Sequence, residues 1–309
     1  MLKKIFITLA IVVGIVLVGG GGFIWYLYHS VQSTANKIYD PAGGSGKNSS
    51  AIKNLQAFPI LLLGVDERKG DVGRSDTMIA LTLNPTKKSM QMISVPRDTK
   101  AEIVGHGTVN KINSAYAYGG PKMALNTFNN LFNVNFKHYL RINMEGLADL
   151  VDAVGGVTVH NDIDWRDEGY YKKGYHYQKG DITLDSGAKA LGYVRMRHLD
   201  PRGDFGRNQR QRDVIMAVIN KAASFGSFSK YQDILNAVQK NVKTNLTFDD
   251  MKNLASNYRD SKQNVQNYEV KGSDDWEKTS SGSKIYYLQI SDDEKERVHQ
   301  MIQDQLTDE

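Results

Sequence analysis

The chain has 309 residues, of which 40% are apolar and 24% charged, with no cysteine and a formal net charge of +5. This ordinary globular composition excludes a disordered chain, a collagen-like repeat and a disulfide scaffold. The excess of 39 Lys and Arg over 34 Asp and Glu is too small to define a general polyanion-binding protein.

The first predicted element is the apolar segment Ile5–Leu27, which follows two lysines at the start of the chain. It is longer than the ~20 residues that cross a bilayer as a helix, and aromatic residues at its far end suit the headgroup region. A cleaved signal peptide would have a shorter apolar core and a small-residue cleavage site. We therefore predict a single membrane anchor over 5–28, with residues 1–4 cytoplasmic and the rest of the chain outside the cell.

Residues 29–57 are rich in Ser, Asn, Gly and Lys, a composition that predicts a flexible linker. Length alone suggests about two domains of ~150 residues. The anchor and linker leave 58–309, however, and we predict one extracellular catalytic domain there, without internal repeats.

Hydrophobic patterns in this domain alternate between the two-residue period of strands and the longer period of helices. They predict strands over Phe58–Val65, Thr77–Leu83, Met90–Val95, His138–Ile142, Val157–Val159 and Tyr286–Ile290. They predict helices over Pro121–Leu131, Met144–Val154, Ser186–Arg195 and Asn208–Ala223, and capping boxes at Thr247-x-x-Asp250 and Ser291-x-x-Glu294. The alternation indicates an α/β or α+β fold with a mixed sheet. The segment 224–309 either completes that sheet or forms a small extension.

Arginine is concentrated in one window of the chain. Six of the 13 arginines lie in Arg195–Arg212, which contains no lysine. A site that grips phosphate oxygens with two parallel hydrogen bonds favours the planar guanidinium over the ammonium. The alternative is a solvated basic helix with internal ion pairs.

The spacing within this window favours a binding site. Arg195 and Arg197 would share one face of an extended segment. Arg207, Arg210 and Gln211 would share one face at the start of a helix, where backbone N–H groups also attract anions.

Two aspartates lie at the edges of apolar strands. Asp66 follows the first predicted strand and Asp76 precedes the second. Two carboxylates together with a phosphate suit Mg²⁺, which takes few protein ligands and several substrate or water oxygens. The alternative is that both residues cap turns or pair with Arg68 and Arg74.

A third polar cluster follows the third strand. Arg97 would contact phosphate, whereas Asp98 would orient an arginine or, as we favour, serve as a turn residue. The patch Lys111–Tyr116 would either line the site or cap the next helix. Cysteine, G-x-S-x-G, H-E-x-x-H and P-loop motifs are absent from the sequence. Catalysis would therefore depend on positioning and charge neutralisation.

Three sequence blocks together resemble the LytR-CpsA-Psr family. They are Leu61–Pro85, Ser94–Thr99 with Lys111–Gly120, and Leu191–Val214. Each block is moderately specific, and their order and spacing make the match strong. The resemblance covers about Phe58 to Ala223, and the N-terminal anchor agrees with it.

The resemblance implies an extracellular phosphotransferase of a Gram-positive cell wall. Such an enzyme moves an anionic glycopolymer, such as wall teichoic acid, from a polyprenyl-pyrophosphate carrier onto the muramic acid 6-hydroxyl of peptidoglycan. A phosphodiester forms and polyprenyl phosphate is released. The implied fold is an α-β-α sandwich with a mixed central sheet, flanking helices and an apolar tunnel for the lipid. The implied partners are the lipid-linked polymer, peptidoglycan and the membrane, without nucleic acid.

The resemblance also implies roles for single residues. Asp66 and Asp76 would hold Mg²⁺ or Mn²⁺ against the pyrophosphate. Its oxygens would be bound by Arg68, Arg74, Arg97, Arg195, Arg197, Arg207, Arg210 and Gln211. The residues implied to be catalytic are Asp66, Arg74, Asp76, Arg97, Arg195 and Arg197.

The implied reaction begins when the acceptor hydroxyl attacks the glycan-side phosphorus. An aspartate would accept the proton, or the metal would activate the hydroxyl, and the sequence does not choose between these routes. One alternative is a membrane-anchored polyprenyl-pyrophosphate phosphatase, in which water replaces the acceptor. A transcriptional attenuator is less favoured, because the anchor places the arginines outside the cell and no helix-turn-helix pattern occurs. A wall-binding module without activity is a further alternative.

Overall fold

The computed structural model describes residues 25–41, 52, 54–67, 70–222, 228–278 and 282–307. Its strands are β1 (Phe58–Val65), β2 (Ser75–Asn84), β3 (Ser89–Val95), β4 (Lys100–Ile103), β5 (Thr108–Lys111), β6 (His138–Asn143), β7 (Val157–Asn161), β8 (Trp165–Arg166), β9 (His176–Tyr177), β10 (Gly180–Leu184), β11 (Val242–Thr244), β12 (Asn264–Glu269), β13 (Ser273–Lys278) and β14 (Lys284–Gln289). Its helices are α3 (Ser114–Phe132), α4 (Met144–Ala153), α5 (Gly187–Arg195), α6 (Asp204–Ala222), α7 (Phe228–Asn241), α8 (Phe248–Asn257), α9 (Asp292–Leu306) and the 3₁₀ helix η2 (Arg259–Gln263). Residues 25–38 form a further helix.

A six-stranded mixed sheet forms the centre of the fold, in the order β11-β6-β1-β2-β3-β12. The hairpins β1–β2 and β2–β3 are antiparallel, whereas β1 pairs with β6 and β3 with β12 in parallel. The residues of β1 are almost all apolar because this central strand is covered on both faces. The predicted mixed α/β class is confirmed.

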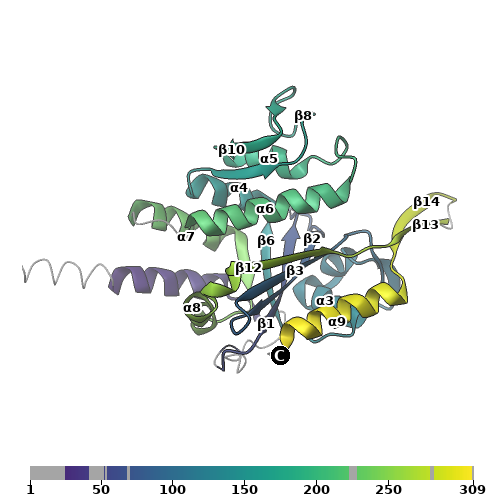
Figure 1. Ribbon diagram of the computed structural model, residues 1–309, viewed down its shortest axis with the longest axis horizontal. Helices are drawn as coiled ribbons and strands as arrows, with labels where there is room; N and C mark the ends of the chain where they lie inside the picture. The colour runs from purple at the N-terminus through teal and green to yellow at the C-terminus, as the bar shows by residue number, and fades with distance from the viewer. Residues whose placement is uncertain are drawn as a thin grey trace, which may run out of the picture.

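Helices cover both faces of the sheet, as Figure 1 shows. On one face, Leu63 and Met78 of the sheet pack with Phe128 of α3 and Val298 of α9 in one apolar core. On the other face lies α6, with α4, α5 and α7 beside it. These helices share a second core with the small β7–β10 sheet, built around Trp165, Tyr177 and Tyr193.

The strands and helices predicted between residues 58 and 223 agree with the structure in type. The helix expected over Pro121–Leu131 is the second part of α3, which begins earlier, at Ser114. Gly119 and Gly120 have non-helical backbone angles and kink it. Pro121 therefore starts a new helical stretch, a position that tolerates its missing N–H.

Both alternatives for 224–309 occur together. The strands β11 and β12 complete the two edges of the central sheet, whereas β13 and β14 form a separate hairpin. The predicted capping box at Thr247 is present at the start of α8. Ser291 likewise caps α9, but the carboxylate of Glu294 accepts a hydrogen bond from the backbone N–H of Lys271.

The N-terminal segment differs from the predicted linker. Residues 25–38 are helical, and Ala35 and Ile38, one helical turn apart, are buried. Tyr39 bridges Thr244 of β11, and the phenol of Tyr139 donates to the carbonyl of Asp40 at 3.0 Å. The folded unit therefore begins before residue 58. The prediction was wrong because two apolar residues one turn apart give a weak signal among polar neighbours.

Residues 5–24 of the predicted anchor and residues 42–51 and 53 of the predicted linker lie outside the described part of the chain. Within the described ranges, no helix combines the length and apolar character needed to cross a membrane. The anchor and its orientation therefore stay predictions.

Candidate active site

One cavity lies where the end of β1 and the start of β2 meet the end of α5 and the first turns of α6. Its volume is about 320 Å³. Seven of the predicted site residues line it: Asp66, Asp76, Arg97, Arg195, Arg197, Arg207 and Gln211. Met144, Tyr170 and His198 also line it. The fold thus gathers residues that are up to 145 positions apart in the sequence into one polar cavity.

The turn between β1 and β2 places the two aspartates. The carbonyl oxygen of Arg74 accepts the backbone N–H groups of both Asp66 and Asp76, at 3.3 and 3.0 Å. Gly73 has φ +72°, and a Cβ atom there would lie 2.5 Å from the carbonyl oxygen of Asp66. Only glycine fits so close a turn without strain. Arg74 itself is exposed and does not line the cavity, and Arg68 lies outside the described residues.

Arg97 is held among three carboxylates. Its Nη1 lies 3.1 Å from Asp76 Oδ1, and its Nε lies 3.1 Å from Asp204 and 3.6 Å from Asp98. Burial alone would lower the pKa of Arg97, but the three negative charges outweigh it and raise that pKa. Arg97 therefore stays charged and links both sides of the cavity. Asp98, favoured above as a turn residue, pairs with Arg97 and Lys111.

Asp66 faces a second arginine, Arg195, at 3.9 Å. Next to it, Glu67 pairs with Arg141 of β6, whose Nε also donates to the phenol of Tyr116 at 3.1 Å. This pairing fixes the chain just after Asp66. It was not predicted, because the parallel pairing of β1 with β6 that brings these residues together joins segments far apart in the sequence.

Arg207 presents a buried cation to the cavity. Its side chain is 9% exposed and its Nη2 lies 3.4 Å from Asp204. Burial, together with the neighbouring Arg97 and Arg197, lowers the pKa of Arg207 despite two nearby carboxylates. Within the described residues, its Nε is buried without a hydrogen-bond acceptor. A buried donor without a partner costs free energy unless a ligand supplies an acceptor, so Arg207 is prepared for an anion.

Arg195 and Arg197 both reach the cavity, although the backbone between them differs from the prediction. Arg195 is the last residue of α5, and the chain leaves the helix at Met196, which has φ −57° and ψ 133°. The helix end, rather than an extended strand, therefore sets the direction of Arg195.

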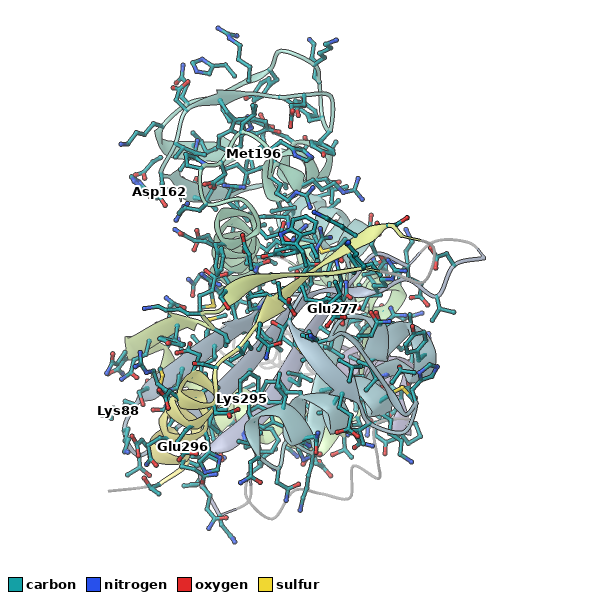
Figure 2. All side chains as sticks on the ribbon, turned by 90° about the vertical axis from the view of Figure 1, so that its right-hand side faces the viewer. Lys88, Asp162, Met196, Glu277, Lys295 and Glu296 are labelled. Carbon is teal, nitrogen blue, oxygen red and sulfur yellow. The ribbon has the colours of Figure 1, made fainter. Side chains whose placement is uncertain are left out.

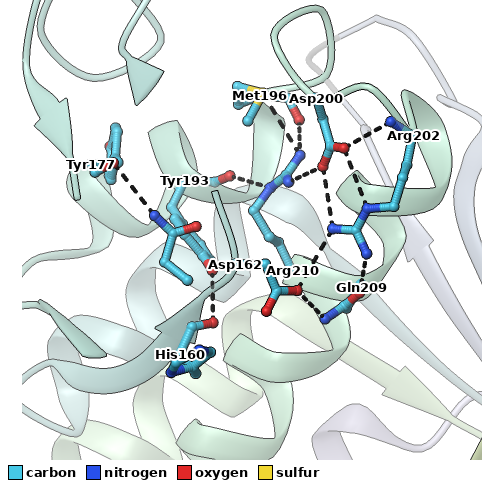
Figure 3. A network of polar contacts seen from close by, with 10 residues as sticks. His160, Asp162, Tyr177, Tyr193, Met196, Asp200, Arg202, Gln209 and Arg210 are labelled. Atoms are coloured by element: carbon cyan, nitrogen blue, oxygen red, sulfur yellow. Dashed lines mark hydrogen bonds and ion pairs between the residues drawn. The ribbon is translucent and has the colours of Figure 1, made fainter. Parts of the chain in front are cut away.

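Arg210 does not line the cavity, contrary to the prediction. Its Nη1 donates to Asp200 at 2.6 Å, and its Nε donates to the carbonyl of Tyr193 at 3.2 Å (Figure 3). At ~100° per residue, Arg210 is rotated about 60° to one side of Arg207 and Gln211 about 40° to the other. That rotation turns Arg210 towards α5. It secures the turn that carries Arg197 and takes no part in the cavity.

Gln211 connects the cavity to the sheet face below it. Its side-chain oxygen accepts a hydrogen bond from the hydroxyl of Thr77 on β2. Thr77 lies close to Gly64 of the neighbouring strand: a Cβ atom added to Gly64 would lie only 2.8 Å from Thr77 Cβ. The floor of the cavity is therefore tightly packed.

A loop between β8 and β9 brings Tyr170 to the cavity. The buried carboxylate of Asp167 accepts four backbone N–H groups of this loop, including that of Tyr170 at 3.1 Å and that of Tyr171 at 2.7 Å. The loop rests on Gly192 of α5, where a Cβ atom would lie 2.6 Å from Tyr171 Cβ. The sequence analysis missed this wall, because no motif marks it.

The replacement Asp167→Ala is expected to raise the KM for the cavity's substrate about tenfold, the equivalent of ~1.4 kcal/mol. Four N–H groups would lose their acceptor, and Tyr170 would no longer be held against the cavity. Steady-state kinetics of Asp167→Ala and Tyr170→Ala would measure the effect. If both variants retain the wild-type KM, the loop does not contact the substrate.

Glu269 at the end of β12 lies beside α6, where Asn208 donates to it at 3.3 Å. Burial raises the pKa of Glu269 to about 7, against the opposing effect of Arg212. The ordinary pKa of a glutamate is about 4.3. Glu269 therefore loses its proton at a lower pH in the unfolded chain than in the folded protein. The associated stability is complete below about pH 4.3 and is lost as the pH rises towards 7.

Glu269→Gln is therefore expected to raise Tm by about 2–4 °C at pH 8, the size of a ~1 kcal/mol gain, with little effect near pH 4. Thermal melts at both pH values would measure this. The exposed Glu296, labelled in Figure 2, provides the control, because Glu296→Gln should leave Tm unchanged at either pH. An equal shift at pH 4 and pH 8 would contradict the titration argument.

The chain is thus a mixed α/β protein that gathers arginines and aspartates in one cavity at an edge of its central sheet. The LytR_cpsA_psr family profile matches residues 25–304, so the chain belongs to this family. The predicted family is confirmed, and the match includes the N-terminal helix and nearly all of the C-terminal segment.

Relatives found by sequence and solved structures agree with this assignment. The chain is 44% identical over 291 residues to the polyisoprenyl-teichoic acid–peptidoglycan teichoic acid transferase TagU of Bacillus anthracis, covering 93% of each chain. It matches the crystal structure of B. subtilis TagU with a TM-score of 0.64 and 38% identity, over 82% of this chain and 97% of that one. It matches TagT bound to LIIa-WTA with a TM-score of 0.69 and 28% identity, over 87% and 99% of the two chains.

Proposed function

We propose that this chain transfers teichoic acid from a polyisoprenyl carrier to peptidoglycan. The observation that carries the proposal is the cavity itself, whose described lining holds four arginines and two aspartates and no lysine. The TagU relatives, similar over almost the whole chain, carry this activity in their names. The enzyme acts on the cell wall, so its catalytic domain faces outwards. We further propose that residues 5–28 anchor it in the membrane.

The arginines bind the pyrophosphate that links the polymer to its carrier. Arg195 enters from the end of α5 and Arg197 from the turn that follows it, whereas Arg207 enters from the start of α6. Arg97 enters from just beyond the end of β3. Their planar groups match the paired oxygens of phosphate. Arg207 supplies the buried Nε donor described above. Together they offset charge that develops on the phosphate oxygens as the bond to the leaving group breaks.

Asp66 and Asp76 are the proposed metal ligands. Among the described residues, no group of three or more His, Cys, Asp or Glu side chains could hold a metal. Two carboxylates in one cavity nevertheless suit Mg²⁺, which completes its shell with substrate oxygens and water. When bound, Mg²⁺ would neutralise negative charge on the pyrophosphate.

In the proposed reaction, the oxygen of a peptidoglycan hydroxyl forms a bond to the glycan-side phosphorus. The bond from that phosphorus to the bridging oxygen breaks, and polyisoprenyl phosphate leaves with the electron pair. The hydroxyl proton passes to a carboxylate of the cavity, either Asp66 or Asp76. The new phosphodiester joins polymer and peptidoglycan.

The lipid is proposed to follow an apolar strip on the sheet face below the cavity. Thr77, which bonds Gln211 at the cavity floor, is followed on the same face of β2 by Ile79, Leu81 and Leu83. Leu81 and Leu83 are partly exposed and, like Met216 of α6, pack against the buried cluster that contains Ile79. An apolar strip that starts at the phosphate site and is incompletely covered suits the first isoprenoid units.

The purified full chain should join lipid-linked teichoic acid covalently to peptidoglycan in the presence of Mg²⁺. The assay measures polymer bound to washed peptidoglycan and polyisoprenyl phosphate released, each with and without peptidoglycan. Release that depends on peptidoglycan supports transfer. Equal release without peptidoglycan would identify a phosphatase instead. Chelation followed by addition of Mg²⁺ tests the metal separately.

A further inference from the structure

A second cavity adjoins the active site. It has a volume of about 440 Å³ and lies between the end of β3, the turn after α5 and strand β14. Arg197 and His198 line both cavities, so the second cavity lies directly beside the candidate active site. A molecule bound there would therefore approach the phosphate from the side of Arg197.

The lining of this second cavity combines aromatic and polar side chains. Tyr286 and Phe205 supply ring faces, whereas Asp98, Arg202 and His198 supply charged or polar groups. Sugars present apolar C–H faces, which pack on aromatic rings, and hydroxyl groups, which bond to such polar side chains. The mixture therefore fits a sugar better than it fits an isoprenoid chain, which would need apolar walls alone.

The aromatic surface continues outside the cavity on the β13–β14 hairpin. The indole of Trp276 is 59% exposed, and its ring lies 5.2 Å from that of Tyr286, centre to centre. Exposed aromatic surface that continues from the lining of a cavity is a candidate binding surface. The two rings would let a chain of sugars extend from the cavity onto the hairpin.

The hairpin is held firmly in this position. The backbone N–H of Leu288 donates to the carbonyl of Asp98 at 2.9 Å. Lys100 donates to Asp275 at 2.9 Å and also pairs with Glu277, which Figure 2 labels on the hairpin. A fixed aromatic surface binds a ligand without first paying the entropy of ordering itself.

We propose that the second cavity and the hairpin bind the acceptor, a peptidoglycan glycan strand of N-acetylated sugars. This inference rests on the proposed function and adds where the acceptor lies. One sugar occupies the cavity beside Arg197, so that its free hydroxyl points to the phosphorus, and the neighbouring sugar lies on Trp276. The proposed lipid strip starts at Thr77 and Gln211, neither of which lines the second cavity, so that acceptor and leaving group would approach the phosphorus from separate parts of the site.

The test uses the full chain and measures transfer while the concentration of soluble, uncrosslinked peptidoglycan strands is varied. Trp276→Ala and Tyr286→Leu are each expected to raise the acceptor KM about tenfold, while the donor KM stays within twofold. Tyr118→Ala is the matched control, because Tyr118 is an exposed tyrosine that lines neither cavity. It should change neither constant.

The outcomes separate this inference from the function on which it rests. If the wild-type chain transfers nothing to peptidoglycan, the proposed function fails. If it transfers normally and the two variants keep the wild-type acceptor KM, the acceptor does not bind here. A rise in the donor KM instead would assign the second cavity to the sugars of the donor and would overturn the inference. Tm measurements on each variant identify any loss of folding.

Discussion

Asp76→Asn is expected to lower kcat for polymer transfer by about 10²–10³-fold, the effect typical of removing a group that organises transition-state charge. Asparagine has the same shape and keeps an oxygen for Arg97, which lies 3.1 Å from Asp76 Oδ1. It removes the negative charge that counters Arg97 and that would hold the metal or accept the proton. The loss should therefore appear in kcat rather than in folding.

The control for this prediction lies in the same turn. Asp71 caps the backbone N–H of Gly73 at 2.9 Å and does not line the cavity. Asp71→Asn keeps an acceptor oxygen there, so activity should stay within about twofold. Initial rates of polymer attachment to peptidoglycan, with Tm recorded for both variants, measure the difference. An Asp76→Asn enzyme with wild-type kcat would remove Asp76 from the chemistry.

The sequence predicted seven residues that the fold gathers in one cavity, because most of them follow local patterns. Three local signals were clear in the sequence: Asp66 follows an apolar strand, Asp76 lies at the start of the next strand, and one window is rich in arginine. The antiparallel register pairs the end of β1 with the start of β2. Asp66 and Asp76 therefore lie at the same edge of the sheet.

Side-chain direction was the harder part of the prediction. Arg207 and Arg210 are three residues apart on one helix, yet only Arg207 faces the cavity. The carboxylate of Asp200, brought close by the turn after α5, gives Arg210 a buried partner that no spacing rule reveals. Tyr170 and Trp276 were missed for a related reason, because loops and hairpins derive their place from contacts between distant segments.

The N-terminal helix was not predicted for the same reason: contacts with distant parts of the chain stabilise it. Residues 25–38 carry little periodic signal by themselves, and an isolated short helix is marginal in water. Burial of Ala35 and Ile38, and the bridge from Tyr39 to Thr244, stabilise it. Tertiary contacts thus decided what composition alone assigned to a flexible linker.

Asp200→Asn is expected to destabilise the protein by about 3–5 kcal/mol at pH 7, the usual cost of removing one member of a buried ion pair. The side chains of Asp200 and Arg210 are 0% and 4% exposed, and they lie 2.6 Å apart. Asparagine would leave the charge of Arg210 buried without a counterion. A Cβ on Gly206 would lie 1.7 Å from Asp200 Oδ2, so the turn has no room to rearrange around the change.

The ion pair between Asp200 and Arg210 also makes the stability of the folded protein depend on pH. Burial would raise the pKa of Asp200, but hydrogen bonds from Arg210 and Arg202 outweigh it and hold that pKa below its usual range. The stability that Asp200 contributes is therefore complete above about pH 4 and is lost as the pH falls through the lowered pKa. The Tm difference between wild type and Asp200→Asn should be large at pH 7 and should shrink below about pH 4.

Calorimetric melts from pH 3 to pH 7 measure this difference, and Asp185→Asn is the control. Asp185 is 70% exposed and pairs with Lys189 at 3.6 Å, so its loss should cost little. Asp200 and Arg210 hold the turn that carries Arg197, which lines both cavities. The variant should therefore also lose transfer activity at temperatures where it remains folded. If Asp200→Asn kept wild-type activity and a pH-independent Tm difference, the buried pair would be a packing feature without influence on the arginine site.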